Sequence, residues 1–108
     1  MPIDIQLSPN FKKEAKKLIK KYPSLKTELT ELYDILLDKP DTGTSLGQGV
    51  YKVRLGIASK STGKSGGARV MTFYKIDENS LLLFSIYSKG KKENISDKEI
   101  QMLLTPYR

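Results

Sequence analysis

Hydrophobic and polar residues follow two different periods along the first part of the chain, which predicts a strand followed by two helices. Residues 3–7 alternate with period two, as in a short strand. Ser8 can cap a helix whose first position is Pro9, and apolar residues then recur at helical spacing as far as residue 19. Tyr22-Pro23-Ser24 interrupts this pattern and recaps the chain, and a stripe of apolar residues runs from 25 to 36. Two helices joined so tightly are expected to form a hairpin.

The second half of the chain has the pattern of a sheet followed by one helix. Residues 40–49 are rich in Pro, Gly, Thr and Ser and are expected to form a loop, with strands at about 50–57, 68–75 and 80–88 after it. The Asp77-Glu78-Asn79-Ser80 segment predicts a tight turn, so the last two strands should pair antiparallel. Ser96-Asp97-Lys98-Glu99 is a capping box with Ile95 and Ile100 as its hydrophobic staple, and it starts a short C-terminal helix.

The order β-α-α-β-β-β-α predicts an α+β fold. We expect an antiparallel β-sheet with the N-terminal helical hairpin packed on one face and a short helix at the C-terminal end. The 108 residues supply one hydrophobic core, and no repeat or linker interrupts the pattern. Residues 1–108 are therefore expected to form a single domain.

Composition excludes several kinds of chemistry. The chain contains no histidine and no cysteine, which rules out histidine-based catalytic triads, thiolate nucleophiles and disulfides. The nearest groups of carboxylates lie in apparent turns, so we expect no metal site and no cofactor. The longest apolar run, residues 81–84, is too short to span a bilayer, and the first residues lack a signal-peptide pattern. A soluble cytoplasmic protein with no membrane partner is expected.

Cations gather between residues 52 and 69, where no acidic residue balances them. The five are Lys52, Arg54, Lys60, Lys64 and Arg69, and the whole chain carries a net charge of +7. They lie on a predicted strand pair and on the Gly/Ser/Lys loop that joins it, which favours binding of a polyanion such as nucleic acid. The solvated face of an ordinary half-buried sheet would show the same alternation, but the absence of acidic residues as far as Lys75 favours a functional interpretation.

Strand periodicity predicts the face on which each candidate lies. Apolar residues of the strand at 50–57 share one face, so Lys52 and Arg54 should project from the other, away from the helical hairpin. On the third strand, Tyr87 lies opposite Leu82, Phe84 and Ile86 in the alternation. A consistent register would bring four side chains together on a face without helices, with lysines after the last strand at the rim. The four are Lys52, Arg54, Arg69 and Tyr87, and the rim lysines are Lys89, Lys91 and Lys92.

Three segments carry a resemblance to a known family: Tyr51-Lys52-Val53-Arg54-Leu55, Gly63-Lys64-Ser65-Gly66-Gly67-Ala68-Arg69 and Ile86-Tyr87-Ser88-Lys89. With these motifs, and over nearly its whole length, the chain resembles the RelE/ParE superfamily of bacterial toxins, and within it the HigB/RelE-type branch of type II toxin–antitoxin systems. The resemblance implies a RelE-like fold and a ribosome-dependent mRNA endoribonuclease (an mRNA interferase) that needs no metal ion and inhibits translation.

The resemblance also implies roles for individual residues. Lys52 and Arg54 match the paired basic strand positions, one of which would act as general base or stabilise the transition state. Arg69 matches the arginine that holds the scissile phosphate. Tyr87 lies near a residue that transfers a proton or stacks on a base, and Lys89 matches a late basic residue that stabilises charge or protonates the leaving group. RNA-binding positions would be Lys60, Lys64, Lys91 and Lys92. Some relatives use a Glu/His pair that this chain lacks, so a basic site without carboxylates is expected.

The resemblance leaves other functions open. A ParE-like protein would inhibit DNA gyrase without catalysis, and an inactive relative would bind RNA and leave it intact. In each toxin case the expected partner is an acidic antitoxin that wraps the basic surface and adds a helix or strand. The free toxin is expected as a monomer, with larger complexes forming with the antitoxin, and the nuclease would also contact mRNA and the ribosome.

Overall fold

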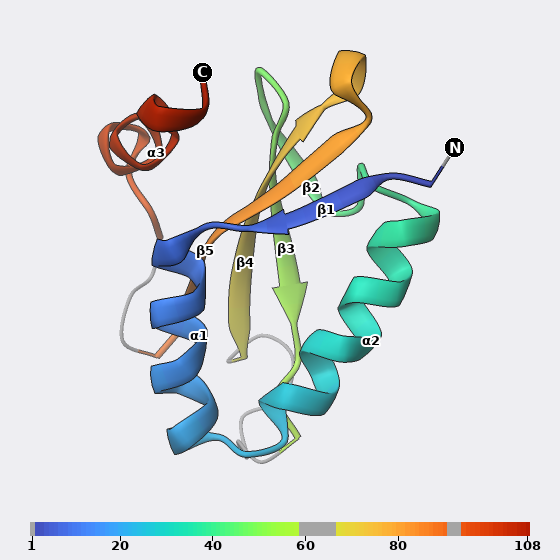
Figure 1. Ribbon diagram of the computed structural model, residues 1–108. Helices are drawn as coiled ribbons and strands as arrows, with labels where there is room; N and C mark the ends of the chain where they lie inside the picture. Colours follow the sequence, from blue (N-terminus) through green and yellow to red (C-terminus); the bar gives the residue numbers. More distant parts are fainter. Residues whose placement is uncertain (1, 59–66, 91–93) are drawn as a thin grey trace.

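The structure is a computed structural model that describes residues 2–58, 67–90 and 94–108. Its helices are α1 (Pro9–Lys21), α2 (Leu25–Asp38) and α3 (Asp97–Leu104), and its strands are β1 (Asp4–Leu7), β2 (Thr44–Gly47), β3 (Val50–Leu55), β4 (Ala68–Lys75) and β5 (Ser80–Ser88). Within these residues the strands form one sheet in the order β1-β5-β4-β3-β2. Helices α1 and α2 lie on one face of the sheet (Figure 1). The predicted α+β fold, with its helical hairpin and short last helix, is confirmed.

Local capping signals fix the starts of two helices. The Ser8 hydroxyl accepts a hydrogen bond from the Phe11 N–H at 3.0 Å, with Pro9 at the first helical position of α1. The Ser96 hydroxyl accepts from the Glu99 N–H at 3.2 Å at the start of α3. Both starts are as predicted, because a cap depends only on residues within one turn of the helix.

The expected cap at Ser24 is wrong. Ser24 stands at the N-cap position of α2, but its backbone is already helical, with φ −66° and ψ −18°, and its side chain makes no capping bond. Its hydroxyl instead donates to Glu28 Oε1 at 3.1 Å. The preceding Pro23 therefore ends the first helix without extending the chain far enough for a serine cap.

The expected loop at 40–49 contains strand β2, which the sequence did not reveal. β2 pairs antiparallel with β3, and the two strands are joined by Gly47, Gln48 and Gly49, which all have positive φ angles of 89°, 53° and 83°. A Cβ on Gly49 would lie 2.8 Å from the Tyr74 carbonyl oxygen, so this position requires glycine. All four residues of β2 are exposed, so no burial pattern marks it in the sequence.

The sheet is mixed rather than wholly antiparallel. β1 pairs parallel with β5, with Ile5 opposite Leu81, while β4 pairs antiparallel with β5 and with β3. The last antiparallel pair is connected by a 3-10 turn, Ile76–Glu78, followed by Asn79 in the left-handed conformation. The sequence predicted this turn and the strands beside it, but it carried no signal for the parallel pairing of two strands more than seventy residues apart.

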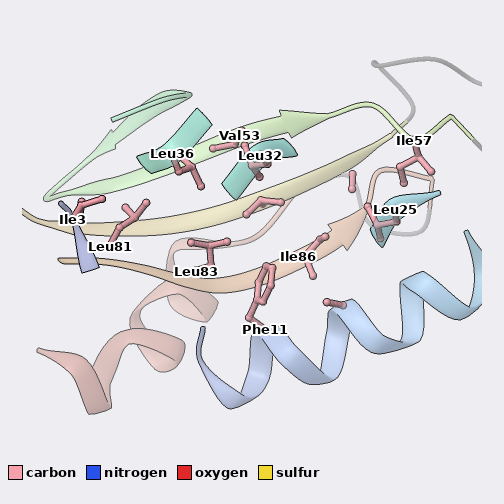
Figure 2. Packing of buried hydrophobic residues seen from close by; sticks show 13 residues of the cluster. Ile3, Phe11, Leu25, Leu32, Leu36, Val53, Ile57, Leu81, Leu83 and Ile86 are labelled. Atoms are coloured by element: carbon pink, nitrogen blue, oxygen red, sulfur yellow. The ribbon is translucent and has the colours of Figure 1, made fainter. Parts of the chain in front are cut away.

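One hydrophobic cluster fills the space between the sheet and the helices α1 and α2. Figure 2 shows Phe11 from α1 and Leu32 and Leu36 from α2 directed toward Leu83 and Val53 of the sheet. Each of these five side chains is buried, and their removal from water is the main favourable term for this half of the fold.

A second hydrophobic cluster lies on the other face of the sheet, which is therefore not free of helices as expected. Here α3 buries Ile100 and Leu104 against Phe84, Leu82 and Met71 of the sheet. We call this side of the sheet the α3 face. The expectation failed because alternation marks Phe84 and Leu82 as buried without saying which element covers them.

Helices α1 and α2 meet at their short connection and diverge from it (Figure 1). Both pack on the sheet rather than mainly on each other, so an open groove remains between them. In the part of the chain that the structure describes, no helix is long and apolar enough to cross a membrane.

Candidate nucleic-acid interface

Three of the candidate residues form one row across the centre of the sheet. Arg54 on β3 is the cross-strand partner of Arg69 on β4, and Arg69 is the partner of Tyr87 on β5. Directly opposite residues have Cβ atoms about 4.5–5.5 Å apart. Lys52 lies two residues before Arg54 on β3 and is the partner of Met71 in the next row on the same face. The register that the sequence predicted for these four residues is therefore confirmed.

The four side chains differ in their access to solvent. Arg69 and Tyr87 are each only 5% exposed, whereas Arg54 is exposed and Lys52 is half-buried. The Arg69 guanidinium donates through Nη1 to the Ala68 carbonyl oxygen at 3.2 Å. The row thus has an accessible cation at one end and a deeper cation and aromatic ring behind it.

Two arginines in directly opposite positions repel each other. A like-charge pair of this kind costs roughly 0.2–1 kcal/mol on a sheet. Neither Arg54 nor Lys52 takes part in an ion pair with another of the described residues, among which the recorded ion pair joins Lys75 and Glu78 at 3.8 Å. An anion bound between the arginines would relieve this repulsion, so the row is suited to a phosphate.

A β-bulge decides the direction in which Tyr87 points. On β4 the successive residues Met71 and Thr72 pair with Ser85 and Leu83, so Phe84 is an extra residue in β5. The extra residue shifts the alternation and leaves Tyr87 on the same face as Phe84. The predicted position of Tyr87 away from the hairpin is confirmed, but the prediction that it lies opposite Leu82 and Phe84 is wrong. The bulge is the reason.

Helix α1 holds this bulge from the side. β1 pairs with only the first half of β5, and polar side chains of α1 bind the backbone beyond it. Glu14 Oε1 accepts from the Ser85 hydroxyl at 2.9 Å and from the Ile86 N–H at 3.3 Å, while the Asn10 amide donates to the Phe84 carbonyl oxygen at 3.0 Å. Asn10 and Glu14 therefore position Tyr87, and the sequence analysis missed them because they lie on a lysine-rich helix with no local sign of this contact.

Glu14→Ala is expected to lower the free energy of unfolding by about 1–3 kcal/mol, because the buried Ser85 hydroxyl and Ile86 N–H would lose their acceptor. Glu14→Gln retains an amide oxygen and should lose less. Urea denaturation of the two variants measures the difference, with Glu31→Ala, an exposed carboxylate on α2, as the control. Equal stability of Glu14→Ala and the wild type would contradict this role for Glu14.

Asn94 is a further residue near the cations that the sequence did not single out. Its Oδ1 accepts from Lys52 Nζ at 3.5 Å and from its own neighbour, the Ile95 N–H, at 3.0 Å. The contact joins β3 to the segment that leads into α3. It limits the positions that the Lys52 ammonium adopts beside Arg54.

The remaining candidates lie at or beyond the end of the strands. Lys89 directly follows β5 and is half-buried, and its backbone N–H donates to the Gly67 carbonyl oxygen at 2.9 Å. This bond extends the β4–β5 pairing and holds the start of the Lys89 side chain at the same end of the sheet as Arg69. Four predicted RNA-binding residues lie outside the described residues: Lys60, Lys64, Lys91 and Lys92. Among the residues that are described, no group of three or more His, Cys, Asp or Glu side chains could hold a metal ion.

Comparison with known proteins identifies a family. Residues 8–105 match the family model described as the RelE toxin of the RelE / RelB toxin-antitoxin system. Among solved structures, an arginine-to-alanine double mutant of the E. coli toxin RelE in the free state is similar, with a TM-score of 0.65, 14% sequence identity and coverage of 100% of each chain. At this identity the structural likeness shows the fold alone. No curated protein matches the chain.

Proposed function

The chain belongs to the RelE toxin family of toxin–antitoxin systems, and on that basis we propose that it is an endoribonuclease that cleaves messenger RNA on the ribosome and so inhibits translation. The observation that carries this proposal is the row formed by Arg54, Arg69 and Tyr87, with Lys52 beside it on the same face. A protein that only bound another protein would not need two cations in directly opposite positions.

The proposed reaction uses the RNA's own 2′-hydroxyl as the nucleophile. A base removes the 2′-hydroxyl proton, the 2′-oxygen forms a bond to the adjacent phosphorus, and the bond from phosphorus to the 5′-oxygen of the next nucleotide breaks. The leaving oxygen takes up a proton, and the upstream product ends in a 2′,3′-cyclic phosphate. The transition state carries more negative charge on the phosphoryl oxygens than the substrate does. Fixed cations therefore stabilise it selectively.

Each candidate residue has a proposed part in this reaction. Arg69 would hold the scissile phosphate, and either Lys52 or Arg54 would act as the base or stabilise the transition state. Tyr87 would transfer a proton or stack on a base, and Lys89 would stabilise charge or protonate the leaving oxygen. General acid–base catalysis would add roughly a hundredfold to ten-thousandfold.

The wider setting is also part of the proposal. The ribosome would supply much of the substrate orientation, so activity on free RNA should be weak. Lys60, Lys64, Lys91 and Lys92 would bind the RNA backbone on either side of the site. The protein would act in the cytoplasm and would be inhibited by the antitoxin partner that membership of this family implies.

Arg54→Ala is expected to reduce messenger RNA cleavage by on the order of a hundredfold, because one cation at the developing charge is lost. Arg54 is exposed, so the variant should fold like the wild type. Controlled expression in bacteria followed by mapping of transcript ends measures the loss, with Lys39→Ala, an exposed cation at the end of α2, as the control.

The same experiment separates the alternative functions. New transcript ends that disappear in Arg54→Ala support the nuclease. Growth arrest with a DNA-damage response and intact transcripts would indicate a ParE-like inhibitor of gyrase. Association with RNA without growth arrest or new ends would indicate an inactive RNA-binding relative.

A further inference from the structure

A long groove with an apolar floor separates α1 from α2 (Figure 1). It has a volume of about 700 Å³ and lies on the face of the sheet opposite the Arg54–Arg69–Tyr87 row. Its floor includes Phe11, Ala15 and Ile19 from α1 and Leu29 and Tyr33 from α2. Tyr33 is 43% exposed, so apolar surface remains open to water along the groove.

Lysines form the rim of this groove. Lys12, Lys16 and Lys20 recur every four residues on α1, each one position after a floor residue of the same helix, and Lys26 stands on the α2 side. From residue 11 to residue 20 the helix rises about 13 Å. The apolar strip and its basic rim therefore run together for between two and three turns of a helix.

No carboxylate lines the groove to balance these lysines. Glu14, the acidic residue of α1, is turned away from it and binds Ser85 and Ile86 of β5. Within the described part of the chain, none of the four rim lysines is ion-paired. An apolar strip flanked by unbalanced positive charge has the complementary shape and charge to one kind of ligand, an amphipathic helix with acidic flanks.

We propose that this groove binds an amphipathic helix of the antitoxin, with apolar residues facing the floor and carboxylates facing the rim lysines. The inference rests on the antitoxin partner that family membership implies and not on the cleavage chemistry. RNA would leave the apolar floor uncovered. A second copy of this chain would bring lysines against lysines. An acidic helix satisfies both the floor and the rim.

Fluorescence anisotropy with a labelled synthetic peptide tests the proposal. The probe is an amphipathic helix of about 16 residues, with leucines at i, i+4 and i+8 and glutamates beside them. K12E/K16E/K20E reverses the rim, and K13E/K17E/K21E makes the same charge change on the α1 surface that does not line the groove. The rim variant should bind the peptide at least about tenfold more weakly, and the control variant should change by less than about threefold.

Three results would overturn the proposal: no binding to the wild type, equal loss in both triple variants, or equal binding of a peptide with every glutamate replaced by glutamine. Displacement of the peptide by an RNA oligonucleotide at equal concentration would point to RNA as the occupant and would also overturn it. Tyr33→Ala tests the floor and should weaken binding while leaving the rim charge intact. Arg54→Ala should bind the peptide like the wild type, so failure of the groove and failure of the nuclease are distinguishable.

Discussion

Arg69→Ala is expected to reduce the rate of messenger RNA cleavage by about a hundredfold to a thousandfold, which is the loss typical of removing one preorganised donor to a developing anion. Arg69 occupies the middle of the row, between Arg54 and Tyr87. It is almost completely buried, so protein surrounds its charge and water screens it less than it screens an exposed cation. Its loss should therefore reduce cleavage more than the loss of Arg54.

The measurement is the rate of cleavage of a defined messenger RNA by the purified toxin on stalled ribosomes. Arg69→Lys keeps the charge but not the two-pronged geometry of the guanidinium, so it should recover only part of the rate. Far-ultraviolet circular dichroism and a thermal melt establish that each variant is folded. A folded Arg69→Ala variant with wild-type cleavage would show that the row is not the phosphate site.

Phe84→Ala is expected to lower the free energy of unfolding by about 3–5 kcal/mol, the range for removing a buried phenylalanine. Phe84 is fully buried and is the bulge residue of β5. Its ring packs in the cluster that joins α3 to the sheet, with Ile100 and Leu104. Truncation would leave a cavity beneath α3 and remove contacts that hold this helix on the sheet.

Urea denaturation measures this loss, and Met102→Ala is the matched control. Met102 lies on the same helix but is 67% exposed, so its truncation should change the free energy of unfolding by less than about 0.5 kcal/mol. A similar small change for Phe84→Ala would mean that α3 contributes little to the stability of the fold. Hydrogen exchange in α3 should rise selectively in Phe84→Ala, because this helix would detach first.

The direction of each strand side chain was predictable up to the bulge and no further. Alternation placed Lys52 and Arg54 on one face of β3 correctly, since that strand is regular over its whole length. The same alternation failed for Phe84 and Tyr87, because it assumes that every residue turns the chain by half a period. An added residue in β5 has no signature in composition, and its hydrogen-bond partners on α1 are 71 to 74 residues away in sequence.

The sequence by itself determined the helices, the capped starts of α1 and α3, the long antiparallel strands and the basic face of β3. These features depend on periodicity and on hydrogen bonds between near neighbours, which any short segment contains. Only the tertiary structure decided the parallel pairing of β1 with β5, the exposed strand β2, the bulge that turns Tyr87 toward Arg69, and the packing of α3 over the second face. Each of these depends on contacts between distant segments, whose free energy exists only when the whole chain is folded.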